Sequence, residues 1–299
     1  MLRDFSDLQG IVEKKNKNIR TVVAAAHDLH TLKGIGEACL KGMIRPVLVG
    51  DSKKIRSMIS ENDMGFGSAD IIDTKDDTET AVLAAEMIAK GNGHILVKGG
   101  MQTSDLLREI VKKEYGLLTG EIMSHVGLFQ IPTYHKLQLM TDAGMVPCPD
   151  LEQKRQILVN AVNVMNGLGV SQPKVAVLCA AEQLNPKIPA SLDAAELKKL
   201  NGKGEIENCI VEGPISIDLA CSFESAEIKA YTSPVAGDAD ILLMPDMTAG
   251  NICAKALMLA GGAMMAGVIV GVKAPIVVVS RAASADEKYW SLVFAAAMA

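Results

Sequence analysis

The chain has 299 residues, of which 49% are hydrophobic and 3% aromatic, and its 30 basic and 35 acidic side chains give a net charge of −5. At roughly 150 residues per domain, this length suggests two domains, each able to bury a core without disulfide or metal support. The acidic balance argues against a nucleic-acid binder, because such proteins carry a basic surplus. The net negative charge does not exclude a small anionic ligand, because binding of such a ligand depends on the charges close to its site.

Three features bear on the compartment. Residues 1–7 lack the basic and then apolar pattern of a signal peptide. The uncharged run 256–272 is shorter than the ~20 residues of a membrane span and contains four glycines, so we predict the end of a helix, a turn and a buried strand. The six cysteines form no C-x-x-C pair, which favours reduced thiols. We therefore expect a cytoplasmic protein without a membrane partner.

In the first half of the chain, short apolar runs alternate with helical patterns. Strands are predicted at residues 22–26 and 46–51, and a strand with its Gly-rich turn at 94–100. Helices are predicted between the first two strands, ending at Gly42, and at residues 53–59, 81–90 and 106–113. This alternation is typical of βαβ units that form a parallel sheet.

The pattern resumes after the breaker Pro147-Cys148-Pro149, where Asp150 is predicted to cap a long amphipathic helix at 151–168. Further strands are predicted at residues 174–179, 210–214, 240–245 and 275–279. Further helices are predicted at residues 192–200, from Gly250-Asn251 onward and at 286–297. The sequence therefore predicts two α/β domains with a junction near 132–142.

Ligands of such sheets bind at the carboxyl ends of strands and between domains. The turn after the strand at 94–100 carries groups suited to an anion, namely Lys98, Gly100, Thr103, Ser104 and Arg108. Free backbone N–H groups at the following helix would favour negative charge, which Lys98 and Arg108 reinforce. An ordinary capped turn explains the same residues about as well.

A second strand-to-helix turn follows the strand at 240–245. It offers Asp246, Gly250, Asn251 and Lys255 as candidate substrate-binding residues. The alternative is that Asp246 or Thr248 simply caps the helix.

A third group follows the strand at 275–279 and contains Ser280, Arg281, Asp286 and Glu287. Arg281 could bind a phosphate with two parallel hydrogen bonds, and a carboxylate could act as a general base. On the residues alone, we favour the alternative for the carboxylates, in which Ser284 caps the last helix and the two acids complement its dipole.

The remaining polar residues give weaker signals. The histidines His27, His30, His94, His125 and His135 form no metal motif, and a structural role fits each best, although His125 could line a cleft. The acids Asp218, Asp238, Asp240 and Asp246 could gather around Mg²⁺, but their spacing does not show it.

Taken together, these segments resemble the phosphate acetyltransferase and phosphate butyryltransferase family over nearly the whole chain. The most specific segments are Glu212-Gly213-Pro214 with Asp218, 233–237 with Ala239-Asp240, 245–251 with Lys255, and Pro275 with Ser280-Arg281. The short Lys98-Gly99-Gly100 segment, the chain length and Ala282, where acetyltransferases usually have glycine, look more like the butyryltransferase branch.

The resemblance implies reversible acyl transfer between coenzyme A and inorganic phosphate, with a short-chain acyl phosphate as the other partner. Coenzyme A is then a substrate, and no permanent cofactor or metal is expected. The implied fold has two α/β domains with mostly parallel sheets around an inter-domain cleft, as in isocitrate and isopropylmalate dehydrogenases. Domain one would comprise residues 1–137 and 272–299, and domain two residues 138–271. A homodimer or larger homo-oligomer is expected.

The resemblance also implies roles. A carboxylate would deprotonate the coenzyme thiol, whose ordinary pKa is near ~8.5, while Ser280 and Arg281 stabilise charge. Arg108 matches a residue associated with the coenzyme, and Thr103, Ser104, Gly250 and Asn251 are candidate phosphate contacts. The family base falls on Glu287, yet butyryltransferases commonly carry an acid at Asp286. We favour Asp286, with Glu287 as the alternate, because the two point about 100° apart on a helix.

Two alternatives remain open at this stage. One is a metal- and NAD-dependent decarboxylating dehydrogenase of similar fold, which would need clustered aspartates and gripping arginines that the sequence does not show. The other is a non-catalytic coenzyme A-binding protein. The acyl chain, the residues for the coenzyme nucleotide and the physiological direction stay undetermined.

Overall fold

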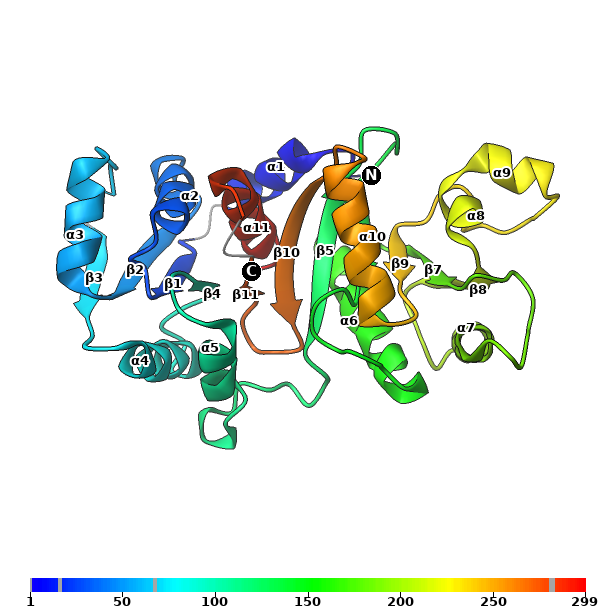
Figure 1. The fold of residues 1–299 in the computed structure, drawn as a ribbon, viewed down its shortest axis with the longest axis horizontal. Coiled ribbons are helices and arrows are strands. Elements are labelled where there is room, and N and C mark those ends of the chain that lie inside the picture. Colours follow the sequence, from blue (N-terminus) through cyan, green and yellow to red (C-terminus); the bar gives the residue numbers. More distant parts are fainter. Residues whose placement is uncertain (1, 16–17, 67–68, 280–282) are drawn as a thin grey trace. The chain divides into compact units, whose positions relative to one another are not determined.

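The computed structural model describes residues 2–15, 18–66, 69–279 and 283–299, and Figure 1 shows its ribbon. The chain forms two compact units. Unit A comprises residues 6–121 and 266–299, and unit B comprises residues 1–5 and 122–265. Relative to the domain bounds expected from the sequence, this division assigns 1–5 and 122–137 to unit B and 266–271 to unit A. The C-terminal segment belongs to unit A, so that unit is discontinuous in sequence.

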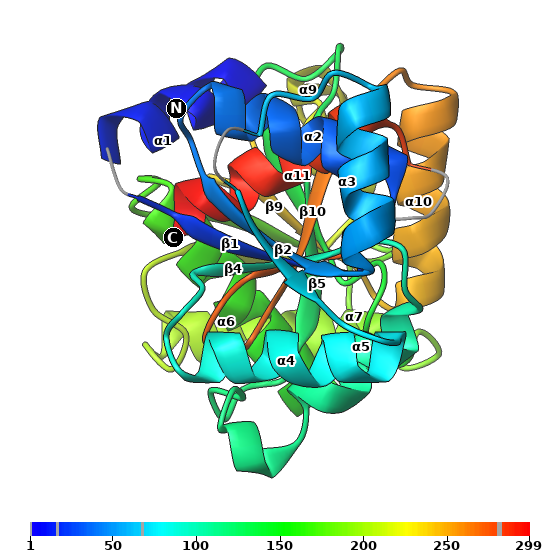
Figure 2. The same ribbon diagram turned by 90° about the vertical axis from the view of Figure 1, so that its left-hand side faces the viewer.

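Unit A alternates strands and helices. Its elements are α1 (Phe5–Lys15), β1 (Arg20–Ala24), α2 (Leu29–Leu40), β2 (Arg45–Gly50), α3 (Ser52–Glu61), β3 (Asp70–Asp73), α4 (Asp77–Ala89), β4 (Ile95–Lys98), α5 (Thr103–Ile110), a 3₁₀ turn (Lys113–Tyr115), β10 (Met264–Val270), β11 (Ile276–Val277) and α11 (Ala285–Met298). The strand order is β3-β2-β1-β4-β11-β10, and only β10 is antiparallel to its neighbour β11. Figure 2 shows α2 and α11 on one face of this sheet and α4 and α5 on the other.

Unit B has the same layered design. Its elements are β5 (Ser124–Gln130), β6 (Gln138–Thr141), α6 (Leu151–Gly167), β7 (Lys174–Leu178), α7 (Pro189–Gly202), β8 (Ile210–Ile215), α8 (Ile217–Cys221), α9 (Phe223–Ile228), β9 (Ile241–Leu243) and α10 (Met247–Leu259). The strand order is β5-β6-β9-β7-β8, with β5 antiparallel to β6 and the others parallel. Helices α8, α9 and α10 share one hydrophobic cluster with these strands.

Side-chain caps fix where many helices begin. A capping side chain accepts a backbone N–H that the first helical turn cannot satisfy. Such caps are made by Asp28, Asp51, Asp76, Asp150, Ser222, Asp246 and Ser284. The predicted cap at Asp150 is confirmed, and Gln153 completes a capping box there. These short acidic and hydroxyl residues therefore act as local start signals for the α/β pattern.

The run 256–272 is confirmed as the end of α10, a turn and the strand β10. The expectation that Gly250-Asn251 opens a helix is wrong, because α10 already begins at Met247 behind its cap Asp246. No helix in the described part of the chain has the length and apolar character that crossing a membrane requires.

The helix α11 is anchored in the core of unit A, with most of its side chains buried. It packs closely on α2, where a Cβ on Gly34 would lie 3.1 Å from the carbonyl oxygen of Ala285 and from the amide nitrogen of Tyr289. Lys288 Nζ donates to Asp28 Oδ1 at 2.5 Å. The residues at the start of α11 are thus held by a packed helix pair.

Candidate functional site

The carboxyl edge of the unit A sheet gathers several strand ends. Strands β1, β2, β4 and β11 are parallel, so the segments that follow them meet at one edge. The chain goes from β1 to β2 on one side and returns to β4 on the other side of β1. Ligands of doubly wound sheets bind at such a reversal of strand order. The relevant segments here are residues 25–28 and 99–102.

The end of β4 is shaped by its two glycines. A Cβ on Gly99 would lie 2.2 Å from the carbonyl oxygen of Ala25, so only glycine fits this close approach. The N–H groups of Gly99 and Gly100 donate to Ala24 and Ala25, each at 2.8 Å. Lys98 is buried, and its Nζ donates to the carbonyl oxygens of Gly99 and Met101, both at 3.0 Å. Its ammonium group therefore braces the turn from inside.

The first turn of α5 has no side-chain cap, because Gln102 at the N-cap position makes no such hydrogen bond. The alternative considered from the sequence, an ordinary turn capped by a side chain, is therefore wrong for the start of α5. Thr103 is half-buried and Ser104 exposed. Arg108 is 70% exposed and lies 3.4 Å from Asp105, a contact that leaves most of the guanidinium in solvent. Backbone N–H groups and a nearby cation are thus presented together, an arrangement suited to an anion.

The two acids at the start of α11 differ in their surroundings. Glu287 forms a capping box with Ser284, in which its carboxylate accepts the Ser284 N–H at 2.9 Å. Asp286 is exposed and has no hydrogen bond or ion pair with any residue that the structure describes. The expected cap at Ser284 is confirmed. The predicted residues Ser280 and Arg281 lie outside the described residues.

In unit B, the loop after β6 and the start of α10 meet at the carboxyl edge. Asp246 accepts the Ala249 N–H at 2.9 Å, so the capping alternative is confirmed for this residue. The N–H of Gly250 donates to the Asp246 carbonyl at 3.1 Å. A Cβ on Gly250 would lie 2.6 Å from the carbonyl oxygen of Asp142. Gly250 therefore permits close packing, and its amide is engaged within the helix.

Two further candidates lie on α10. Asn251 Nδ2 donates to the carbonyl oxygen of Ala143 at 3.1 Å, which joins the helix to the loop after β6. One amide hydrogen and the carbonyl oxygen of Asn251 remain available, since the side chain has two donors. Lys255 is exposed and forms no ion pair within the described ranges. Gly250 and Asn251 thus hold α10 against the loop after β6, whereas the Lys255 ammonium group faces solvent.

Sequence reasoning missed Asp142, which organises that loop. Its side chain is buried, Oδ1 accepts the N–H groups of Gly144 and Met145 at 2.7 Å, and Oδ2 accepts the N–H of His125 at 2.8 Å. Burial lowers the pKa of His125, and the nearby Asp142 carboxylate partly opposes this. The available signal was an acid directly after a strand end, followed by a small residue and a glycine.

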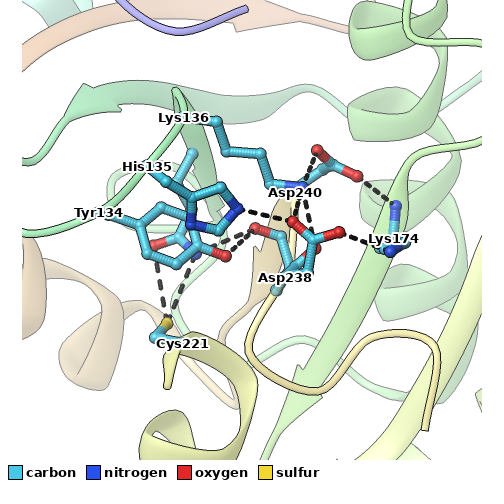
Figure 3. A network of polar contacts seen from close by, with 9 residues as sticks. Tyr134, His135, Lys136, Lys174, Cys221, Asp238 and Asp240 are labelled. Carbon is cyan, nitrogen blue, oxygen red and sulfur yellow. Dashed lines mark hydrogen bonds and ion pairs between the residues drawn. The ribbon is translucent and has the colours of Figure 1, made fainter. Parts of the chain in front are cut away.

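A polar network occupies the opposite edge of unit B, at the amino ends of β6, β7 and β9 (Figure 3). Lys136 Nζ lies 2.8 Å from Asp238 and 2.6 Å from Asp240, and Lys174 lies 2.5 Å from Asp238. Burial disfavours ionised Asp238, but hydrogen bonds from Lys136, Lys174 and His135 outweigh it and hold its pKa well below the usual range. Asp238 and Asp240 therefore serve lysine pairs instead of the Mg²⁺ cluster considered from the sequence.

The comparisons with known proteins agree on one family. A family model described as phosphate acetyl/butaryl transferase matches residues 77–296. Phosphate butyryltransferase of Clostridium acetobutylicum is 37% identical over 300 residues, covering 100% of this chain and 99% of its own. Phosphate acetyltransferase of Thermotoga maritima is 39% identical over 293 residues, covering 98% and 99%. Overall identity thus does not separate acetyl from butyryl relatives.

Solved structures give the same result. A branched-chain phosphotransacylase from Enterococcus faecalis matches with a TM-score of 0.83 and 33% identity, covering 94% of this chain and 98% of that one. A 4-hydroxythreonine-4-phosphate dehydrogenase from Burkholderia phymatum matches with a TM-score of 0.53 at 12% identity, covering 93% and 96%. The second likeness concerns the fold alone.

Proposed function

This chain belongs to the phosphate acetyl/butaryl transferase family, and on that premise we propose that it interconverts acyl-CoA plus phosphate with acyl phosphate plus coenzyme A. The observation that carries the mechanism is Asp286. It is an exposed carboxylate at the first turn of a rigidly packed helix, shortly after the Ser280-Arg281 pair in the sequence. An exposed carboxylate without a partner among the described residues suits a general base.

The reaction needs one proton transfer and one displacement. The Asp286 carboxylate takes the proton of the coenzyme thiol, whose ordinary pKa near ~8.5 leaves little thiolate at neutral pH. The sulfur then attacks the acyl carbonyl carbon, and the bond from that carbon to the phosphate oxygen breaks. Ser280 and Arg281 stabilise the developing oxyanion and the departing phosphate, a role that rests on the family resemblance.

The choice of Asp286 over Glu287 is supported by hydrogen bonding. The Glu287 carboxylate already accepts the Ser284 N–H, so withdrawing it for catalysis would break the helix cap. Asp286 has no such commitment in the described part of the chain. Glu287 therefore contributes by fixing the start of α11.

Two turns carry the candidate substrate-binding residues, which are Lys98, Gly100, Thr103, Ser104 and Arg108 in unit A and Asp246, Gly250, Asn251 and Lys255 in unit B. Lys98, Gly100 and Asp246 contribute by shaping these turns, since their polar groups are engaged there. We assign Thr103 and Ser104 to phosphate contacts and Arg108 to the coenzyme. Because the Gly250 amide is engaged in the helix, Asn251 and Lys255 are the unit B residues with groups to offer a phosphate.

Several expectations stay predictions. These are the isocitrate dehydrogenase-like fold, which the distant dehydrogenase likeness supports at the level of fold, the homo-oligomer, the cytoplasmic location and the lack of a permanent cofactor. All six cysteines are free, as a reducing compartment would leave them. The preference for a butyryl or branched acyl group over acetyl also stays a prediction.

The test is to offer coenzyme A with acetyl, butyryl and isobutyryl phosphate and to measure thioester formation for each. We expect a thioester with at least one donor, and faster formation with butyryl or isobutyryl phosphate than with acetyl phosphate. No thioester from any donor would overturn the proposal. Coenzyme A binding without turnover would then favour a binding protein, and nucleotide-linked absorbance change with hydroxy acids plus Mg²⁺ would favour a dehydrogenase.

A further inference from the structure

Three buried side-chain atoms in the described part of the chain have no hydrogen-bond partner there, namely Nδ1 of His27, Nδ1 of His125 and Oδ1 of Asn166. Such atoms are rare in folded proteins because each costs free energy, so each needs an explanation. His27 Nδ1 is closed in by β2, since a Cβ on Gly50 would lie 3.0 Å from it. Asn166 lies near the end of α6, ahead of β7. His125 alone borders the loop that joins the carboxyl edge of unit B to α10.

The backbone of His125 is fixed from both sides. Its N–H donates to Asp142 Oδ2 at 2.8 Å, and its carbonyl accepts the hydroxyl of Thr141 at 2.9 Å. Both partners belong to the end of β6 and the loop that follows it. The position of the imidazole is therefore set by the same residues that set the loop.

The His125 ring packs on this loop at Gly144, where a Cβ would lie 3.4 Å from Cγ and 3.8 Å from Cδ2. The loop also contacts α10 at two points. The Ala143 carbonyl oxygen accepts a hydrogen bond from the Asn251 side chain, and the Asp142 carbonyl oxygen packs against Gly250. His125 and the start of α10 therefore border one short loop, and Asn251, one of the two proposed phosphate contacts of unit B, is bonded to that loop.

The protonation state of the His125 ring allows it to act as an uncharged hydrogen-bond donor. Burial lowers the pKa of His125, which favours an uncharged ring near neutral pH. An uncharged imidazole carries one N–H and one lone pair. Because enclosed unpaired N–H groups are rarer than unpaired acceptors, the proton belongs on Nε2 and the lone pair on the enclosed Nδ1. Nε2 has no partner among the described residues and is free to donate.

We propose that His125 is a further substrate-contacting residue, which donates a hydrogen bond from Nε2 to an oxygen of the acyl phosphate or of inorganic phosphate. This inference rests on the proposed function and names one residue of its phosphate site. A hydrogen bond to a charged oxygen is stronger than a neutral one, so its loss should weaken binding by about 10- to 100-fold.

The experiment compares His125→Ala, His125→Gln and the wild type at saturating coenzyme A. We expect His125→Ala to raise KM for acyl phosphate about 10- to 100-fold while KM for coenzyme A stays within about 2-fold. The glutamine variant should recover most of the loss, since its amide nitrogen can donate at a reach similar to Nε2. Asn166→Ala, which removes another unpaired atom, is the matched control and should leave both KM values unchanged.

Binding of inorganic phosphate, measured by calorimetry on the same proteins, separates this inference from the proposed function. Weaker phosphate binding in His125→Ala, with recovery in His125→Gln, supports the contact even if the wild type forms no thioester. Unchanged KM and phosphate affinity in His125→Ala overturn the contact even if the wild type is active. Equal rises in both KM values without recovery by glutamine also overturn it, because they indicate a merely structural role.

Discussion

Ser284 and Glu287 exchange two hydrogen bonds at the start of α11, with the serine N–H to the glutamate carboxylate at 2.9 Å and the glutamate N–H to the serine hydroxyl at 3.1 Å. This exchange engages one of two adjacent acids. Asp286, about 100° away around the helix, stays outside it. The Asp286 carboxylate is therefore available to take a proton, whereas the carboxylate of its neighbour Glu287 is engaged in the helix cap.

Exchanging each acid for its amide should separate the two roles. Asp286→Asn removes the base and should lower kcat for thioester formation by about 10²- to 10⁴-fold with little change in melting temperature. Glu287→Gln keeps an acceptor for the cap, so it should cost at most about 1 kcal/mol of unfolding free energy and retain most of the turnover. Kinetics and thermal unfolding of both variants provide the check. A fully active Asp286→Asn beside an inactive Glu287→Gln would reverse the assignment.

The two glycines after β4 should respond differently to a methyl group. Gly99→Ala places Cβ 2.2 Å from a backbone oxygen, so the strand end must move, and we expect a loss of about 3 kcal/mol or more. Gly100→Ala meets its nearest atoms at 3.5 Å, an ordinary contact, and should change stability by about 0.5 kcal/mol or less. Urea unfolding of the pair measures this difference. Equal stability of the two variants would contradict the close approach at Gly99.

The Asp28–Lys288 pair should contribute acid-dependent stability. Burial raises the pKa of Asp28, but hydrogen bonds from Lys288 and Thr31 outweigh it and lower the pKa from 3.8 to about 2. A depressed folded-state pKa gives stability that is present above about pH 4 and is lost as the pH falls through about 2. After solvent screening we expect about 1 kcal/mol from this source.

Unfolding free energies of wild type and Asp28→Asn at pH 5 and pH 2.5 provide the measurement. The decrease between the two pH values should be smaller in the variant, because it lacks the titrating carboxylate. The same decrease in both proteins would show that the ion pair contributes nothing to folding. Other acidic groups titrate in both proteins, so their effect cancels in the comparison.

Lys136 should matter for stability and not for catalysis. It is 5% exposed between Asp238 and Asp240. Lys136→Met would leave the buried Asp240 carboxylate without its lysine, while Asp238 keeps Lys174 and His135, at a cost of about 3 kcal/mol. Lys229, which is exposed and pairs with Glu182 and Asp218, is the control, and Lys229→Met should cost about 1 kcal/mol or less. The folded Lys136→Met enzyme should keep its kcat, since the network lies at the amino edge. A large kcat loss at full stability would refute this separation.

Most of the parallel strands could be predicted because they are buried and read as apolar runs, whereas the half-exposed parallel strand β3, Asp70–Asp73, has no such run and was not predicted. The prediction at 46–51 matches β2, Arg45–Gly50, and the one at 174–179 matches β7, Lys174–Leu178. Strands β5 and β6 were not predicted. They are joined by a loop and pair antiparallel at the side of unit B, and their short segments lack a clear apolar run between turn signals.

The candidate site was predictable only where a local pattern carries the chemistry. The turn after β4 and the acids of α11 stand out in the sequence, because glycine, hydroxyl and charged residues follow a strand end. Asp142 does not, because its role lies in three backbone N–H groups that meet only in the folded loop. The distinction between Asp286 and Glu287 likewise depends on which carboxylate closes the capping box.

The discontinuity of unit A has a consequence for biosynthesis. Strand β11, which pairs with β4, and helix α11, which packs on α2, leave the ribosome only after all of unit B has been made. Unit B can therefore acquire its structure while β4 still has an unpaired edge and α2 an uncovered face. Since exposed strand edges are prone to aggregation, the nascent protein is most vulnerable in the interval before residues 266–299 arrive.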